Sequence, residues 1–130
     1  MPPGPSAAPV PKPPDQRLGR RRRLVASRLF DQAYEQRRKF VGRFMLLFLR
    51  SGEGASLRLG VVTGRKVGAA HVRTKSRRRL REVFRRNRER LRGRYDVVLI
   101  ARAGVDRAPW GEVVKDFLAL AGRAGILSDE

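Results

Sequence analysis

The segment from residue 70 to residue 92 constrains the fold more than any other part of the chain. Its apolar and small residues recur every three or four positions, so in a helix they fall on one narrow face, and most other positions are arginine. Such a helix can bury only the narrow face and must turn arginines outward. The residues of the narrow face are Val72, Ser76, Leu80, Val83, Phe84, Asn87 and Leu91.

The charge of the chain is concentrated around this segment. Residues 64–94 hold 14 basic and 2 acidic residues, whereas residues 95–130 hold 4 basic and 6 acidic ones. Arginines four positions apart on a helix repel one another, and bound phosphates would turn that repulsion into attraction. We therefore expect a polyanion-binding surface whose affinity falls steeply with salt. Its expected front consists of Arg77, Arg78, Arg81, Arg85 and Arg88.

Composition narrows the class of partner. Of the 31 basic residues 26 are arginine, and the formal net charge is +19. A guanidinium pairs with phosphate through two hydrogen bonds and stacks on bases, which favours nucleic acid over an anionic membrane. The chain has no cysteine, and its longest apolar run, from Phe44 to Leu49, is far shorter than the roughly 20 residues that span a bilayer. We expect a cytoplasmic protein without a secretory signal or membrane contact.

The chain divides into a tail and one domain. Seven of the eight prolines lie in residues 1–14, and a run of four arginines ends at Arg23. This composition predicts a disordered Pro/Arg-rich tail over residues 1–22, which could act as a polyanion-seeking arm. The remaining length suits a single α/β domain over residues 23–125.

Periodicity predicts the elements of that domain. A first helix should begin after the N-cap Ser27 and run to about Arg38. The stretch from Phe40 to Arg50 should form one strand, or two if it breaks at Gly42, and the alternating residues from Leu57 to Thr63 should form its half-buried hairpin partner.

The C-terminal part should hold a strand and a helix. The run from Tyr95 to Ala101 predicts a central strand. A last amphipathic helix should be entered through Pro109 and closed near Gly122 or Gly125. The expected order is helix, two or three strands, helix, strand, helix.

The stretch from Leu57 to Arg86 resembles the core signature of the bacterial ribonuclease P protein family. It departs from that signature at Thr63 and Gly64, at Thr74 where asparagine is usual, and at Arg77 where lysine is usual. A weaker likeness extends over roughly residues 23–120. The matching positions, in identity or charge, are Arg58, Gly60, Arg65, Lys66, Gly68, Ala70, Arg73, Arg78, Arg81 and Glu82.

The resemblance implies a fold and a function. The fold is a two-layer α/β (α+β) sandwich of order αβββαβα, grouped with the second domain of ribosomal protein S5, in which the arginine-rich helix makes an unusual left-handed crossover between two parallel strands. The implied function is that of the ribonuclease P protein subunit, which binds the catalytic RNA and the 5′ leader of precursor tRNA and so assists endonucleolytic maturation of the tRNA 5′ end.

The resemblance also implies roles for particular residues. The residues implied to bind the leader are Phe30, Tyr34 and Arg37. Two aromatic rings one helical turn apart beside an arginine could stack on bases. Both rings could instead belong to the core. The residues implied to bind the RNA subunit are Arg65, Lys66, Arg73, Lys75, Arg77, Arg78, Arg81 and Arg85.

The residues indicate no protein active site. His71 is the only histidine, and the acidic residues are scattered without the paired spacing that holds two magnesium ions. The resemblance implies that the RNA subunit carries catalysis and requires Mg²⁺, that the protein binds no cofactor, and that it is a monomer in a 1:1 ribonucleoprotein with ribonuclease P RNA.

Three other functions fit parts of the pattern. A ribosomal or other structural RNA-binding protein would share the charge distribution but have no role in cleavage. A DNA-binding architectural protein is disfavoured, because the basic helix is flanked by strands without a helix-turn-helix or dimerising heptads. A membrane-surface protein would need to expose the apolar face that we assign to the core.

Overall fold

The computed structural model of the chain describes residues 23–24 and 27–128. The tail expected over residues 1–22 lies outside the described residues. The order of the major elements is the expected αβββαβα, because the stretch from Phe40 to Arg50 does form two strands. The elements are α1 (Ser27–Gln36), β1 (Arg38–Val41), β2 (Met45–Arg50), β3 (Leu59–Val62), the 3₁₀ turn η2 (Arg65–Val67), α2 (Ala70–Asn87), the 3₁₀ turn η3 (Arg88–Arg90), β4 (Asp96–Ala101) and α3 (Trp110–Ala124).

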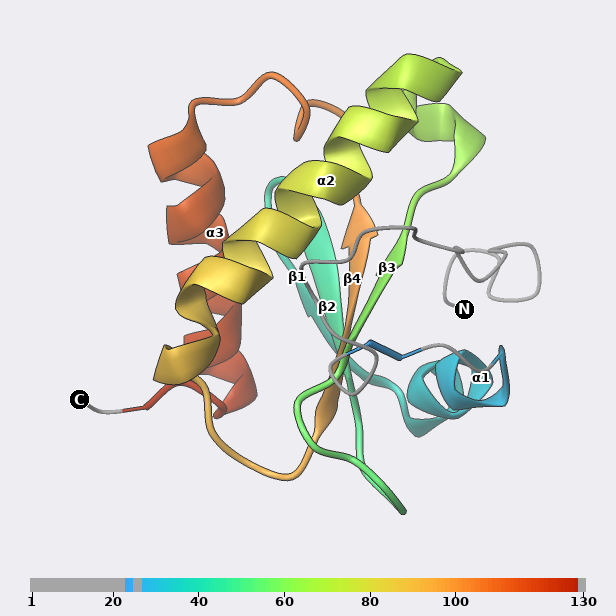
Figure 1. Cartoon of the computed structure of the whole chain (residues 1–130), viewed down its shortest axis with the longest axis vertical. Helices are drawn as coiled ribbons and strands as arrows, with labels where there is room; N and C mark the ends of the chain where they lie inside the picture. The colour runs from blue at the N-terminus through green and yellow to red at the C-terminus, as the bar shows by residue number, and fades with distance from the viewer. Residues whose placement is uncertain (1–22, 25–26, 129–130) are drawn as a thin grey trace.

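The four strands form one mixed sheet in the order β1-β2-β4-β3 (Figure 1). β1 and β2 are antiparallel, as are β2 and β4, whereas β3 runs parallel to β4. β4 is therefore central, as predicted. The expected hairpin between β2 and β3 is wrong, because β2 has its hairpin partner in β1 and its other neighbour in β4.

The path between β2 and β3 explains why they do not pair. Leu57 has a φ of 59°, and its backbone N–H donates to the carbonyl of Tyr95, just before β4. The chain therefore approaches the far side of β4, and the strand begins at Leu59 instead of Leu57. Its four residues are all buried, because helices cover both faces there, so the expected half-buried strand is also wrong.

The helix α2 connects the parallel strands β3 and β4. In Figure 1 both strands run upward, α2 lies in front of them, and β4 lies to the left of β3. The crossover is therefore left-handed, which is the sense that the family resemblance implied and the opposite of the general rule for such connections.

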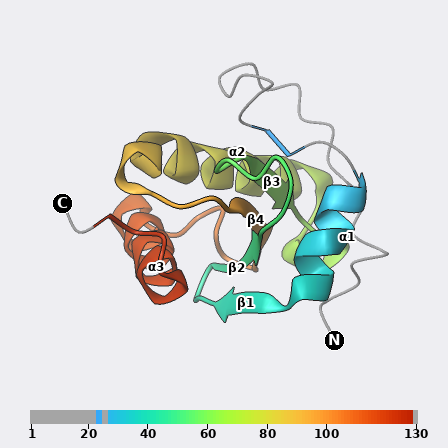
Figure 2. The ribbon, with the colours of Figure 1, turned by 90° about the horizontal axis from the view of Figure 1, so that it is seen from below.

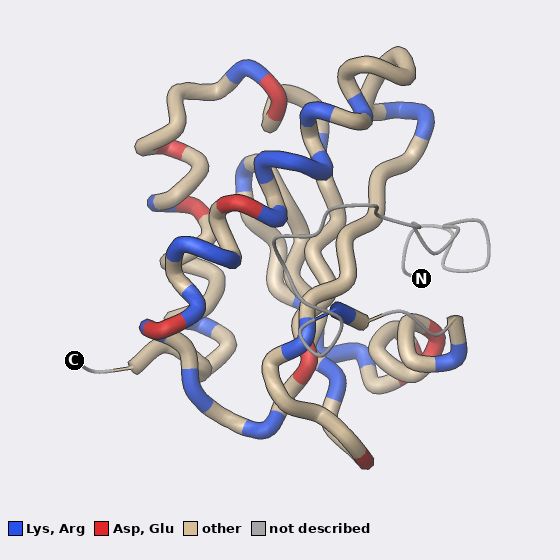
Figure 3. Tube along the Cα trace, in the orientation of Figure 1, with Lys and Arg blue, Asp and Glu red and all other residues tan. Residues whose placement is uncertain are grey.

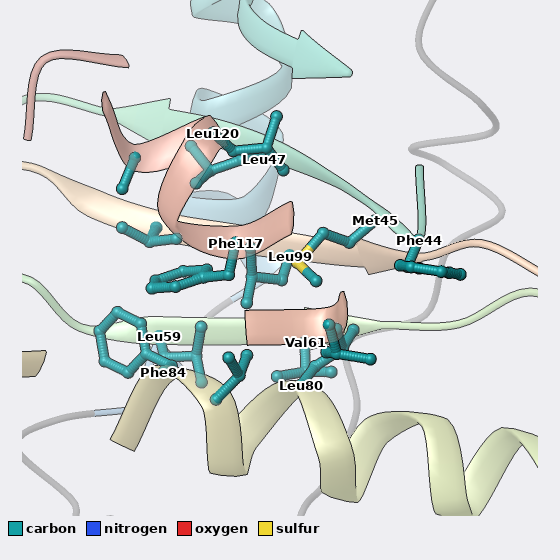
Figure 4. Close-up of a cluster of buried hydrophobic side chains, with 14 of the residues drawn as sticks. Phe44, Met45, Leu47, Leu59, Val61, Leu80, Phe84, Leu99, Phe117 and Leu120 are labelled. Carbon is teal, nitrogen blue, oxygen red and sulfur yellow. The ribbon is translucent and has the colours of Figure 1, made fainter. Parts of the chain in front are cut away.

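Strand alternation separates two apolar clusters. On one face of the sheet, α2 and α3 pack over residues such as Leu47 and Leu99, with Phe84 and Phe117 in contact at 6.3 Å between ring centroids (Figure 4). On the other face, α1 packs over Phe48 and neighbouring residues. Figure 2 shows α1 and α3 on opposite sides of the sheet. The two-layer arrangement of sheet and α2/α3 is as expected, and α1 adds a short cover to the second face.

The helix boundaries differ by a few residues from the prediction. Ser27 is the first helical residue, and α1 ends at Gln36 because Arg37 has a φ of 58° and reverses the chain into β1. The long helix α2 ends at Asn87 instead of near residue 92, and η3 follows it. α3 begins directly after Pro109 and ends at Ala124, and the capping residue Gly125 has a φ of 81°, which suits glycine.

A buried charge cluster at the start of β4 joins three parts of the chain. The carboxylate of Asp96 is fully buried and accepts hydrogen bonds from the guanidinium of Arg50 at 2.7 Å and from that of Arg58 at 2.9 Å. It also accepts the backbone N–H groups of Ser56 and Arg58. Arg50 in turn donates to the side chain of Gln32 on α1. The cluster therefore fixes the loop before β3 and α1 to the centre of the sheet.

Replacement of Asp96 by asparagine should lower the free energy of unfolding by about 3–5 kcal/mol, because the buried Arg50 and the half-buried Arg58 lose their counter-charge. Burial alone would raise the pKa of Asp96, but the hydrogen bonds from Arg58 and Ser56 outweigh it and lower the pKa overall. The stabilisation by Asp96 is therefore complete above roughly pH 5 and is lost as the pH falls. Urea unfolding of the wild type between pH 6 and pH 3 should show this loss. The Asp96→Asn variant should show a flatter profile, and an exposed control, Glu53→Gln, should follow the wild type.

Gly60 lets α1 approach β3. A Cβ atom built on Gly60 would lie 2.5 Å from Cζ of Phe30, whose ring is buried on the strand. We expect Gly60→Ala to lower the free energy of unfolding by about 1–3 kcal/mol, since the ring must move in a packed core. Gly64→Ala is the matched control, because nothing lies within 4 Å of a Cβ there. Equal thermal stability of the two variants would contradict this packing.

Candidate nucleic-acid interface

The basic residues of α2 lie along its whole length, with Glu82 as the acidic residue of the helix, and further acidic positions occur on α3 and in the loop before it (Figure 3). Only the predicted narrow face of α2 is directed to the core, where Ser76, Leu80, Val83, Phe84 and Asn87 are all buried. The rest of the helix circumference divides into a flank beside β3, an outer side and a flank beside α3.

On the β3 flank, arginines are held by oxygen atoms of neighbouring loops. Arg77 donates to the hydroxyl of Thr63 at 3.0 Å and approaches that of Thr74 at 3.5 Å. Arg73 donates to the carbonyl of Gly68 at 3.0 Å. Thr63 and Thr74 are two of the positions that depart from the family signature, and in this chain both hydroxyls orient Arg77.

The turn η2 precedes α2 in the chain. Its residues Arg65 and Lys66 are exposed, as are Lys75 and Arg78 on α2. These four side chains have no carboxylate partner among the ion pairs of the described residues. We use the term basic surface for Arg65, Lys66, Lys75, Arg78 and the half-exposed Arg73 and Arg77.

Two predicted members of the interface differ from the expectation. Arg81 is only 9% exposed, because its position on the helix lies toward the β3 flank, so the prediction that it faces outward is wrong. Arg85 is exposed but pairs with Glu82 at 2.6 Å, as Arg86 does at 2.7 Å. Hydrogen bonds from Arg85 and Arg86 lower the pKa of Glu82 to about 2, so this carboxylate stays charged.

The aromatic residues expected to bind the leader lie in the core. Phe30 and Tyr34 are 2% and 3% exposed, and Tyr34 packs edge-on against Phe48 at 5.1 Å between ring centroids. Burial, with a contribution from Asp31, raises the pKa of Tyr34 to about 12. Neither ring offers a stacking platform, since the apolar stripe of α1 is turned onto the sheet. Arg37, the third residue of this set, is exposed at the end of α1.

Sequence reasoning missed a pocket on the α3 flank of α2. Arg79 donates to the carbonyls of Val105 and Ala108 at 2.8 and 2.6 Å, and its guanidinium lies 5.5 Å from the ring centroid of Trp110. Arg86 lies at the same distance from that ring. The only signal in the sequence was that Arg79 and Arg86 lie on the side of the helix away from Arg77. The pocket is lined by Arg78, Arg79, Glu82, Arg86 and Trp110.

No group of three or more His, Cys, Asp or Glu side chains in residues 23–24 and 27–128 is placed to hold a metal ion. Within the same residues, no helix combines the length and the apolar character needed to cross a bilayer.

The chain matches known proteins over most of its length. The family model described as Ribonuclease P matches residues 18–125. The ribonuclease P protein component of Symbiobacterium thermophilum is 36% identical over 109 residues, which cover 83% of this chain and 95% of the relative. The corresponding component of Syntrophomonas wolfei is 28% identical over 111 residues, covering 85% and 93%.

A solved structure supports the same assignment. The ribonuclease P protein of Thermotoga maritima superposes with a TM-score of 0.68 at 30% identity, and the match covers 78% of this chain and 96% of that one. The region matched by the family model, residues 18–125, contains the left-handed crossover and the arginine-rich helix described above. The chain therefore belongs to the ribonuclease P protein family.

Proposed function

We propose that the chain is the protein subunit of ribonuclease P and that its basic surface binds the RNA subunit. The observation that supports this most directly is the basic surface itself, whose cations on η2 and α2 have almost no acidic neighbours. Each phosphate that such a cation neutralises releases counterions from the RNA, and this release makes the free energy of binding more favourable.

The residues of this proposed contact differ in how firmly they are held. Arg73 and Arg77 are oriented by loop oxygens, so they lose little rotamer freedom when they bind phosphate. Arg65, Lys66, Lys75 and Arg78 are exposed and can adapt to the RNA. Arg85 can contribute while it remains paired with Glu82, whereas Arg81 is buried.

We propose that the 5′ leader of precursor tRNA passes on the α1 side of the sheet. Arg37 is exposed at the end of α1, and the exposed Lys39 and the 47% exposed Val41 of β1 lie on the α1 side, opposite Phe48 and Leu46 of β2. Phe30 and Tyr34 would act indirectly, by fixing α1 on the sheet. Exposed cations beside an exposed apolar side chain suit the backbone and bases of a single strand.

In this proposal the RNA subunit cleaves the phosphodiester bond and binds the required Mg²⁺. The protein binds as a monomer in a 1:1 ribonucleoprotein, acts in the cytoplasm and raises the affinity for precursor tRNA. The support comes from the family membership and from the high positive charge, which a polyanionic RNA would neutralise.

Cleavage of a precursor tRNA by a bacterial ribonuclease P RNA at low Mg²⁺ tests the function. The wild-type protein should restore cleavage at the mature 5′ end. A Lys75→Glu/Arg78→Glu variant should reduce that stimulation by more than about tenfold, because it reverses two charges of the basic surface. The matched control is Arg107→Glu/Lys115→Glu, which reverses two exposed charges outside α2 and should remain within about threefold of the wild type. RNA binding without any stimulation would instead indicate a structural RNA-binding protein.

The salt dependence of binding tests the contribution of η2. If Arg65 and Lys66 each neutralise a phosphate, the double alanine variant should lower the slope of log K against log salt by about two. Filter binding to the ribonuclease P RNA across a series of KCl concentrations measures this slope. An unchanged slope with unchanged affinity would place η2 outside the contact.

A further inference from the structure

The pocket on the α3 flank of α2 has an aromatic base and a cationic rim. Trp110, the first residue of α3, is partly exposed, and the guanidinium groups of Arg79 and Arg86 both lie 5.5 Å from its ring centroid. Arg78 and Glu82 complete the lining. The pocket therefore combines three cations and one anion around a single indole ring.

The two arginines beside the ring are held in different ways. Arg79 is fixed by its hydrogen bonds to the carbonyls of Val105 and Ala108, neither of which neutralises its charge. The side chain of Arg86 is 57% exposed and is attached through Glu82. A ligand could therefore stack on the indole while Arg86 swings outward, and Arg79 would stay in place.

We propose that this pocket binds one unpaired nucleotide of an RNA, with the base stacked on Trp110 and the phosphate paired with Arg79 or Arg86. An aromatic face accepts any base, and guanidinium groups recognise phosphate through paired hydrogen bonds. A free inorganic anion would use only the cations and leave the indole unused. This inference rests on the proposed function, because it adds a second RNA contact to the same subunit.

The position of the pocket is consistent with this ligand. Arg78 belongs both to the pocket and to the basic surface, so an RNA bound along α2 would reach Trp110 without a gap in positive charge. The two acidic residues near the start of α3 are engaged by the β1–β2 turn and not by the pocket. Glu112 pairs with Arg43 at 3.9 Å, and Asp116 accepts the backbone N–H groups of Arg43 and Phe44.

Trp110 is the only tryptophan of the chain, so its fluorescence reports on this pocket alone. The full-length protein would be titrated separately with a bacterial ribonuclease P RNA and with a precursor tRNA, while filter binding measures complex formation. Quenching by either RNA, in proportion to binding, is the expected result, and comparison of the two titrations identifies which RNA supplies the nucleotide. Binding of both RNAs with unchanged fluorescence would overturn the proposal that the pocket binds a nucleotide, and would leave the proposed function intact. If neither RNA binds, both proposals fail.

Two variants separate stacking from folding. Trp110→Leu should weaken binding of the quenching RNA by about tenfold, the lower range for loss of one stacked base. Because this change could also disturb the start of α3, Arg86→Ala serves as a second variant that keeps the fluorophore. It should weaken binding severalfold and reduce the quenching. The matched control is Arg107→Ala, since Arg107 is an exposed arginine near the pocket but not part of its lining. Equal effects of Arg86→Ala and Arg107→Ala on binding would contradict the proposal, because Arg86 would then contribute only nonspecific charge.

Discussion

The carboxylate of Asp96 is the interaction on which the arrangement of the sheet depends. It is fully buried at the start of the central strand, and Arg50, its direct partner in the β2–β4 register, is buried with it. Arg58 and the backbone before β3 bind the same carboxylate. One charge thus holds β2, β4 and the approach to β3 together. The carboxylate also supports placement of β3 on the far side of β4. Because α1 covers the other face of the sheet, α2 crosses on the remaining face, in the left-handed sense.

That crossover determines the use of each side of α2. Its narrow apolar side closes the core, its β3 flank is fixed by loop oxygens such as the hydroxyl of Thr63, and its opposite flank meets Trp110. Arginines that look equivalent in the sequence therefore differ in freedom and in partners. Arg77 is oriented, Arg78 is exposed, and Arg79 fastens the loop before α3. The basic surface therefore combines fixed and adaptable cations.

On the α1 side of the molecule, aromatic side chains attach the helix to the sheet. The glycine at position 60 allows the ring of Phe30 to lie directly on β3, and Tyr34 packs on Phe48 beside it. Both aromatic side chains are therefore used for attachment of α1. The exposed cations nearby include Arg37 and Lys39, and the proposed function assigns the leader strand to them.

The sequence by itself determined the order of the elements, the amphipathic character of α2 and the family, because periodicity, charge and a spaced motif are local properties of the chain. It also left open whether Phe30 and Tyr34 were core residues. Only the tertiary structure decided that β3 pairs with β4, that Arg81 is buried and that Arg79 meets Trp110. The reason is physical: strand pairing and helix packing bring together residues far apart in sequence. Which of several similar arginines reaches solvent then depends on those neighbours and not on local spacing.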